Sequence, residues 1–341
     1  MSAEPLGFIG LVDLAAERLG GRVVGTSDDF FAGAGNLIKP GRGVFVEGKF
    51  TERGKWMDGW ESRRKRSPGH DWCVLELGTT GQILGLDIDT NHFVGNAPSF
   101  ASVEALRTER GTSLDVLDGL PWRTLVAPSA LRPGSQNLFA CLSIGQVSHV
   151  RLNIFPDGGV ARFRVFGRVE PAWEDAPLDE ETARHVPAGL VDLAAVVNGG
   201  LALACSDAFF GPMNNLLMPG RAENMGDGWE TRRRRGPGHD WIVVQLGARG
   251  IPRCLEVDTR YFIGNYPDRC SIERIDAEGT TVTDLIASSQ WMPLLAQTRL
   301  RADARHYFEM ADGDSSATTH LRMNIFPDGG VSRLRVWGSR T

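Results

Sequence analysis

An internal duplication limits what this chain can fold into more than any other feature of its sequence. Residues 58–72 read DGWESRRKRSPGHDW and residues 227–241 read DGWETRRRRGPGHDW, with 12 of 15 positions identical. Blocks that begin at Val12 and at His149 also recur, in the same order and at offsets of 179 and 171 residues. A solenoid period is roughly 20–50 residues, so a repeat this long predicts two copies of one whole domain.

The joint between the two copies is expected where the repeated blocks stop. Residues 169–187 have no counterpart elsewhere and are rich in proline and acidic side chains, a composition typical of linkers. We therefore predict a first domain of residues 1–168, a linker of 169–187 and a second domain of 188–341. About ten extra residues in the first copy fall around residues 44–56.

Within each copy, helix signals are few and short strand-like runs dominate. These runs mix apolar and polar residues and are separated by Gly, Pro, Asn and Asp. Many short strands at such spacing predict an all-β fold, with one antiparallel β-sandwich in each copy.

The block that begins at His149 allows a sharper prediction. VRLNIF and VARFRV flank a Pro-Asp-Gly-Gly sequence, and Asp-Gly is a favoured pair for a two-residue hairpin turn. Such a hairpin would set Asn153 opposite Arg162 and Arg151 opposite Arg164. Like charges directly opposite one another are unfavourable, so carboxylates from the chain or from a ligand are expected over this face.

Composition excludes several classes of function. The formal charge is −5, from 37 basic and 42 acidic residues, which argues against nucleic acid as the main partner. No apolar run approaches the roughly 18–20 residues of a membrane helix, and no secretory signal is evident at the N-terminus. Five cysteines without a CxxC pair indicate reduced thiols and a cytoplasmic location. No P-loop, GxGxxG or zinc motif is present, so no cofactor is predicted.

The opening loop of each copy carries candidate site residues. Arg64 belongs to a basic block that either grips a small carboxylate or forms structural ion pairs. His70 and Asp71 suit a catalytic acid or base with a carboxylate nearby, but a histidine that only holds the loop explains them equally well.

A second candidate segment, DIDTNHFVGN, follows the next predicted strand. Asp87 and Asp89 share one strand face, where they would hold a divalent metal or pair with the arginines; we favour the pairing and predict no metal. The second copy has Tyr261 in place of His92 and Gln245 in place of Glu76. The first copy therefore retains more ionisable side chains.

Taken together, these blocks resemble the allantoicase (allantoate amidinohydrolase) family. The resemblance rests on SDDFF, DGWESRRKRSPGHDW, DIDTNHFVGNAP and RLNIFPDGGVARFRVFG together with their second-copy partners, and it covers nearly the whole chain. It implies two jelly-roll domains of the galactose-binding type, a homo-oligomer, and hydrolysis of allantoate to ureidoglycolate and urea in allantoin and purine degradation. The alternative is a non-catalytic tandem jelly-roll module that binds a small carboxylate or a sugar.

The resemblance supplies no site residues, so these are inferred from the chemistry that allantoate requires. The candidate catalytic residues are His70, Asp71, Glu61 and His92. The candidate substrate-binding residues are Arg64, Asp89, Asn96, Arg151 and Asn153. Their second-copy counterparts are Glu230, Arg233, His239, Asp240, Asp258 and Asn265. We predict one pocket in the first copy, formed by the opening loop and residues 89–96.

Overall fold

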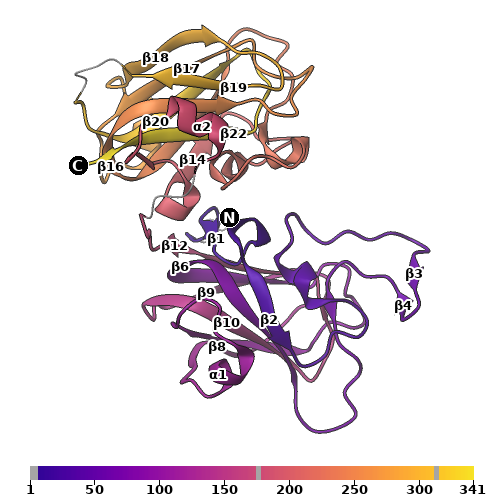
Figure 1. Cartoon of the computed structure of the whole chain (residues 1–341). Helices are drawn as coiled ribbons and strands as arrows, with labels where there is room; N and C mark the ends of the chain where they lie inside the picture. The colour runs from indigo at the N-terminus through magenta and orange to yellow at the C-terminus, as the bar shows by residue number, and fades with distance from the viewer. Residues whose placement is uncertain (1–6, 174–177, 311–314) are drawn as a thin grey trace. The chain divides into compact units, whose positions relative to one another are not determined.

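The computed structural model describes residues 7–173, 178–310 and 315–341. It divides into two compact units, Met1–Glu170 and Pro171–Thr341, each built almost entirely of β-strands (Figure 1). The prediction of an all-β tandem duplication is confirmed. The second unit includes most of the stretch predicted as a linker, and part of that stretch forms the helix α2 (Glu180–His185). Residues 174–177 of the predicted linker lie outside the described residues.

Most elements follow one another in the same order in both units, but β3 and β4 occur only in the first and α2 and η5 only in the second. The first unit contains β1 (Val12–Asp13), η1 (Glu17–Leu19), β2 (Arg22–Thr26), η2 (Ala34–Ile38), β3 (Phe50–Thr51), β4 (Gly54–Lys55), β5 (Trp60–Glu61), β6 (Asp71–Asp89), β7 (Phe100–Leu106), α1 (Leu114–Asp118), β8 (Arg123–Ala130), β9 (Gln136–Ala140), β10 (Gln146–Phe155), β11 (Gly159–Val160) and β12 (Arg162–Val169). The second contains β13 (Val191–Asp192), η3 (Val196–Asn198), β14 (Leu201–Cys205), η4 (Met213–Leu217), η5 (Met225–Asp227), β15 (Trp229–Glu230), β16 (Asp240–Asp258), β17 (Arg269–Ile275), α3 (Val282–Ala287), β18 (Met292–Arg299), β19 (Arg305–Glu309), β20 (Thr318–Phe326), β21 (Gly330–Val331) and β22 (Arg333–Arg340).

One long central strand organises each unit. In the first unit the strand order is β1-β12-β6-β10-β7-β8, with β2 and β9 also paired to β6, and all these pairs are antiparallel. The first part of β6 pairs with β2 and β10, whereas its last part pairs with β9 and β12. In the second unit β16 has the same role with β14, β20, β19 and β22.

The central strand must fold back on itself between these two parts. Ile154 pairs with Asp71 at its start, and Arg162 pairs with Asp89 at its end. A straight strand of this length would span about 60 Å, yet the chain between Ile154 and Arg162 reaches at most about 30 Å. Both ends of β6 therefore lie at the same end of the unit, and its two parts belong to the two layers of a jelly-roll sandwich. Gly81 lies near the change of layer. A Cβ at this position would come within 2.5 Å of the Arg168 carbonyl oxygen, so a larger residue would clash with the neighbouring strand.

The core lies between the layers, as the alternation of apolar residues requires. Its fully buried side chains come from both parts of β6 and from the two strands beside it: Cys73, Leu75, Leu86, Ile88, Val150, Leu152, Phe163 and Val165. A smaller cluster covers the outer face of the first layer, where Leu117 of α1 packs on Val74 beside Trp72 and Trp122. This outer cluster lies on the opposite face of the first layer from the main core, and it packs beside the pocket described below.

The predicted hairpin between β10 and β12 is wrong. These strands pair with opposite parts of β6, so the segment between them connects the two layers. The reason is tertiary. The opening loop holds this segment, because Gly159 pairs with Glu61 and the Asp157 carboxylate accepts the backbone N–H of Lys65 at 2.7 Å. The arginines of β12 consequently lie in the other layer from Arg151, and Arg162 pairs with Asp58 at 2.7 Å.

Candidate functional site

A pocket of about 440 Å³ opens on the outer face of the first layer, where β6 and β7 begin and β10 ends. Strand alternation places its residues, because Arg151 and Asn153 point outward while Leu152 and Ile154 fill the core. We call it the His70 pocket. Its polar lining consists of His70, Ser102, Glu104, Thr124, Arg151 and Asn153.

Hydrogen bonds in this pocket fix the orientation of His70. Its Nε2 lies 3.3 Å from the Asn153 Oδ1, and its ring lies 4.6 Å from that of Phe155. The Asn153 amide nitrogen donates to Ser102 Oγ at 3.2 Å and to Glu104 Oε2 at 3.1 Å. The Asn153 oxygen must therefore accept, so Nε2 of His70 carries a proton. Its Nδ1 has no hydrogen-bond partner among the described residues.

Arg151 is fixed in the same pocket from two sides. Its Nε donates to Glu104 Oε2 at 2.8 Å, and its guanidinium carbon lies 4.7 Å from the centre of the Trp122 ring. Burial opposes ionisation of Glu104, but the hydrogen bonds from Arg151 and Asn153 prevail and hold the pKa of that carboxyl below its usual range. The guanidinium is thus anchored through Nε, and its Nη1 also lies 3.9 Å from the exposed Asp118 carboxylate. At this distance the terminal nitrogens can still turn to a planar carboxylate.

The second repeat contains the same arrangement in a pocket of about 640 Å³. His239 Nε2 lies 3.2 Å from Asn324 Oδ1, and the Asn324 amide donates to Glu273 at 3.0 Å. Arg322 Nε donates to Glu273 at 2.7 Å and stacks 4.9 Å from the Trp291 ring. We call this the His239 pocket. Its recurrence shows that the arrangement belongs to both copies.

A different pocket, of about 630 Å³, contains Glu61, His92 and Asn96. Burial raises the pKa of Glu61, although the Asn96 amide donates to its carboxylate at 2.7 Å. Lys55 and Phe45, from the residues added in the first copy, complete the pocket. We call it the Glu61 pocket. The second repeat keeps only part of it, because Asn265 donates to Glu230 at 2.6 Å but Tyr261 occupies the position of His92.

Asp71 and Asp240 are buried carboxylates paired with half-buried cations, and they line neither His pocket. Asp71 is 1% exposed and accepts from Lys65 Nζ at 2.7 Å and from Ser27 Oγ at 2.9 Å. Asp240 has the corresponding contacts with Arg234 and Ser206. Their geometry fits the structural alternative left open by the sequence.

Asp89, Asp258 and the loop arginines lie elsewhere as well. Asp89 accepts two hydrogen bonds from Arg42, at 2.9 and 3.0 Å, and Asp258 pairs with Arg221 at 3.1 Å. Arg64 is exposed, and so is its counterpart Arg233. The prediction of one pocket is therefore wrong: Glu61, His92 and Asn96 come together, whereas His70 joins Arg151 and Asn153. His70 lies just before β6 and Asp71 is its first residue, and the two side chains point to opposite sides of the sheet, as for neighbouring residues of an extended chain.

In the described parts of the chain, neither a metal site nor a membrane-spanning helix is found. There, no group of three or more His, Cys, Asp or Glu side chains is arranged to hold a metal ion. No helix in those parts is long and apolar enough to cross a membrane. All five cysteines are free.

Comparison with known proteins decides the family. The family model for the allantoicase repeat matches residues 12–170 and again 191–341. The chain belongs to the allantoicase family. A probable allantoicase from Photobacterium profundum is 47% identical over 339 residues and covers 99% of both chains. An allantoicase from Dictyostelium discoideum is 43% identical over 327 residues, covering 95% of this chain and 86% of that protein.

Solved structures agree with this family membership. The crystal structure of an allantoicase from Saccharomyces cerevisiae is 36% identical, with a TM-score of 0.81, and covers 96% of this chain and 92% of that one. A second allantoicase structure is 37% identical with a TM-score of 0.82, covering 96% and 93%.

Sequence reasoning missed several residues in and beside the His70 pocket of this family member, among them Ser102, Glu104 and Trp122. Ser102 and Glu104 alternate with buried Ala101 and Val103 along β7, and Trp122 lies just before β8. The signal was available in the duplication, because the second copy carries Ser271, Glu273 and Trp291 at the matching positions.

Proposed function

We propose that this chain hydrolyses allantoate to ureidoglycolate and urea in allantoin and purine degradation, and that the His70 and His239 pockets carry the reaction. The overall activity follows from the near full-length match to allantoicases. The observation that favours these pockets is the arginine, histidine, amide and carboxylate group found in both repeats. It offers the groups that the reaction needs on two neighbouring strands and the start of a third.

Allantoate carries one carboxylate and two ureido groups on a single carbon. In our proposal the terminal nitrogens of Arg151 bind the carboxylate and hold the reacting carbon beside His70. Nδ1 of His70 removes the proton from the ureido nitrogen that remains, and the electrons expel the other ureido group. The resulting imidazolium gives its proton to the nitrogen of the departing ureido group, which therefore leaves as neutral urea.

Water completes the reaction. Loss of urea leaves a carbon–nitrogen double bond in the remaining molecule, and water adds across it: oxygen to the carbon and a proton to the nitrogen. The product is ureidoglycolate, and no redox step or cofactor is required. Asn153 is a positioning residue, because it fixes the proton on Nε2 of His70 and thereby keeps Nδ1 as the base.

The alternative reading, a binding module without catalysis, is not favoured. Relatives that are 43–47% identical over nearly the whole chain carry the name of the enzyme. Urea released from allantoate by the purified chain, compared with a His70→Ala/His239→Ala variant, tests the proposal. Wild-type protein that binds allantoate but releases no urea would support a binding module. Full activity in the double variant would place the chemistry outside both pockets.

A homo-oligomer and a cytoplasmic location are further parts of the proposal. Large apolar side chains are exposed at corresponding loop positions of both repeats, namely Phe30, Phe31, Val94, Phe209, Phe210 and Ile263. Such side chains suit contacts between subunits, which light scattering of the purified protein would detect. Five free thiols suit a reducing compartment, and cell fractionation tests that location.

A further inference from the structure

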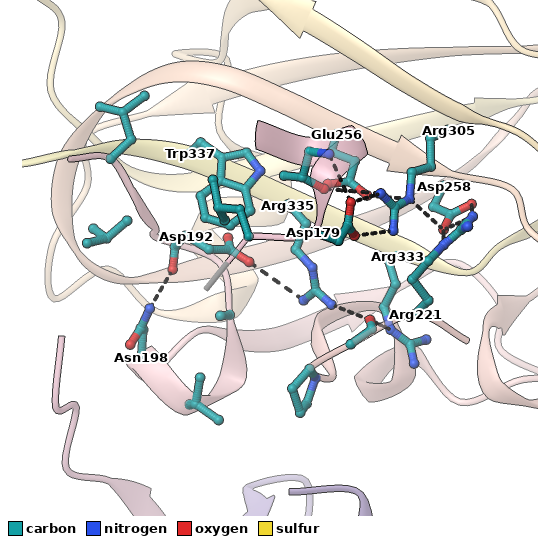
Figure 2. Close-up of a pocket in the computed structure, with 18 of the residues that line it drawn as sticks. Asp179, Asp192, Asn198, Arg221, Glu256, Asp258, Arg305, Arg333, Arg335 and Trp337 are labelled. Carbon is teal, nitrogen blue, oxygen red and sulfur yellow. Dashed lines mark hydrogen bonds and ion pairs between the residues drawn. The ribbon is translucent and has the colours of Figure 1, made fainter. Parts of the chain in front are cut away.

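The second unit contains a cavity of about 560 Å³ that is separate from its His239 pocket. It lies on the outer face of the layer formed by β22, the end of β16 and β19, and residues of α2 and of the segment around it line one side (Figure 2). Its volume falls within the usual range for small-molecule sites. The apolar wall includes Leu178, Pro187, Leu190, Val197, Pro219 and Trp337.

Glu256 is the unusual group in this cavity. It is 5% exposed and accepts no hydrogen bond from any described residue. Its nearest cation is the Arg305 Nε at 3.5 Å, but the terminal nitrogens of Arg305 are held by Asp179 at 2.7 and 2.9 Å. Burial raises the pKa of Glu256 to about 7. A buried carboxyl without a donor is costly, so this position favours a ligand that supplies one.

At the matching position of the first repeat, one carboxylate oxygen has an internal donor, whereas the other has no hydrogen-bond partner among the described residues. Asp87 occupies the place of Glu256, and Gln136 occupies that of Arg305. There Gln136 Nε2 donates to the Asp87 carboxylate at 2.6 Å. In the second repeat the change to Arg305, turned toward Asp179, leaves Glu256 without this internal donor.

Charge selects the kind of ligand. Each of the other carboxylates in the cavity has an arginine, in the pairs Asp179–Arg305, Asp192–Arg335 and Asp258–Arg221. An anion would meet Glu256 without gaining a free guanidinium from these pairs. A cation would lie beside Arg305. The remaining choice is an uncharged molecule with an N–H donor for Glu256.

A carbonyl group on the same molecule would satisfy a second buried atom. Trp337 lines the cavity, and its buried indole N–H has no acceptor among the described residues. Its ring also offers a flat apolar wall. A ureide, in which N–H groups flank a carbonyl, supplies both donor and acceptor within one small planar group.

We propose that this cavity of the second repeat binds a small uncharged ureide through Glu256 and Trp337. It is a binding site distinct from the His70 and His239 pockets, and it does not depend on the proposed reaction.

Hydantoin, a neutral cyclic ureide, is a suitable probe, and isothermal titration calorimetry of the whole chain measures its binding. We expect binding by the wild type and by the His70→Ala/His239→Ala variant alike. Glu256→Ala should weaken it by about tenfold or more, as expected for loss of a buried hydrogen bond to a charged group. Asp87→Ala is the matched control in the first repeat and should leave binding unchanged.

Val197→Phe provides a second test that leaves the charges of the cavity intact. The added ring should fill the cavity and abolish hydantoin binding even if Glu256→Ala fails to fold. Circular dichroism of both variants checks folding. The proposal is overturned if the wild type does not bind hydantoin at millimolar concentrations, if binding survives both changes, or if the double histidine variant loses it.

Discussion

The hydrogen bond between His70 and Asn153, 3.3 Å long, has its direction set by a third residue, Glu104. Glu104 accepts from the Asn153 amide, which turns the amide oxygen toward the imidazole. The same chain of contacts links Glu273, Asn324 and His239. The directions of the hydrogen bonds in the site are therefore fixed by residues of the strands before any substrate binds.

The two His pockets predict how activity divides between the repeats. If both act, His70→Ala should leave about half of the urea release, and so should His239→Ala. The double variant should lose about 10² to 10⁴-fold, as expected for removal of a general acid or base. Rates of urea release compare the three variants, with melting temperatures as the control for folding. Near-complete loss from His70→Ala alone would instead confine the chemistry to the first repeat.

Replacing both pocket arginines by lysine should act on substrate binding. Lysine keeps the charge but not the planar pair of donors, so KM for allantoate should rise by about tenfold or more in Arg151→Lys/Arg322→Lys. We expect a smaller change in kcat. Steady-state kinetics on the double variant measure both. A large fall in kcat with unchanged KM would show that these arginines do not bind the ground-state carboxylate.

His92→Tyr distinguishes the Glu61 pocket from the His70 pocket as the catalytic site. The second repeat already carries tyrosine at the matching position, Tyr261, and both residues have a φ of 68°. The backbone should therefore accept the change. We expect urea release to stay within a few-fold of the wild type. A loss of 10²-fold in a variant with unchanged melting temperature would move the proton transfer to His92.

Asp71→Ala should damage stability more than chemistry. The change removes a buried carboxylate that accepts hydrogen bonds from the half-buried Lys65 and from Ser27, and losing a hydrogen bond to a charged group typically costs about 1.5–3 kcal/mol. Asp240→Ala should have a similar effect through Arg234. Denaturant unfolding measures the loss, and kcat of the remaining folded enzyme should change little. A stable Asp71→Ala variant with severely reduced kcat would assign this carboxylate to catalysis.

Glu256 should make stability depend on pH. Burial raises its pKa from 4.5 to about 7 in the folded chain, so the folded state holds this proton more tightly than the unfolded state. The stabilisation from the bound proton is present below about pH 4.5 and is lost as pH rises through 7. It corresponds to about 3 kcal/mol. Relative to the wild type, Glu256→Gln should therefore gain stability between pH 5 and 8, measured by urea unfolding. A constant difference across this range would contradict the raised pKa.

Repetition made the architecture predictable, but the local turn signal was misleading. Three matched blocks and many short strands sufficed for two all-β domains. The Asp-Gly pair after β10 favoured a hairpin because turn preferences register only neighbouring residues. Bonds from Glu61 and Lys65, nearly 100 positions earlier, hold this segment across the end of the sandwich instead.

The sequence predicted the residue types of the site but not how they group in space. His70, Arg151 and Asn153 were selected for their chemistry, and their grouping depended on which strands meet and which faces they present. Asp71 was selected because it follows His70, yet alternation along the extended chain turns it to the other side of the sheet, where it pairs with the half-buried Lys65. Glu104 escaped attention because its sequence context resembles an ordinary half-buried strand.

The folded-back central strand has a consequence for how each repeat assembles. β6 takes partners that lie on both sides of it in sequence, from Arg22–Thr26 to Arg162–Val169, so neither layer is complete until nearly the whole repeat has been synthesised. Such non-local pairing is slow, with folding times of milliseconds to seconds typical of β-sandwiches. Since both layers depend on this strand, its amide protons should exchange with solvent only through global unfolding of the repeat.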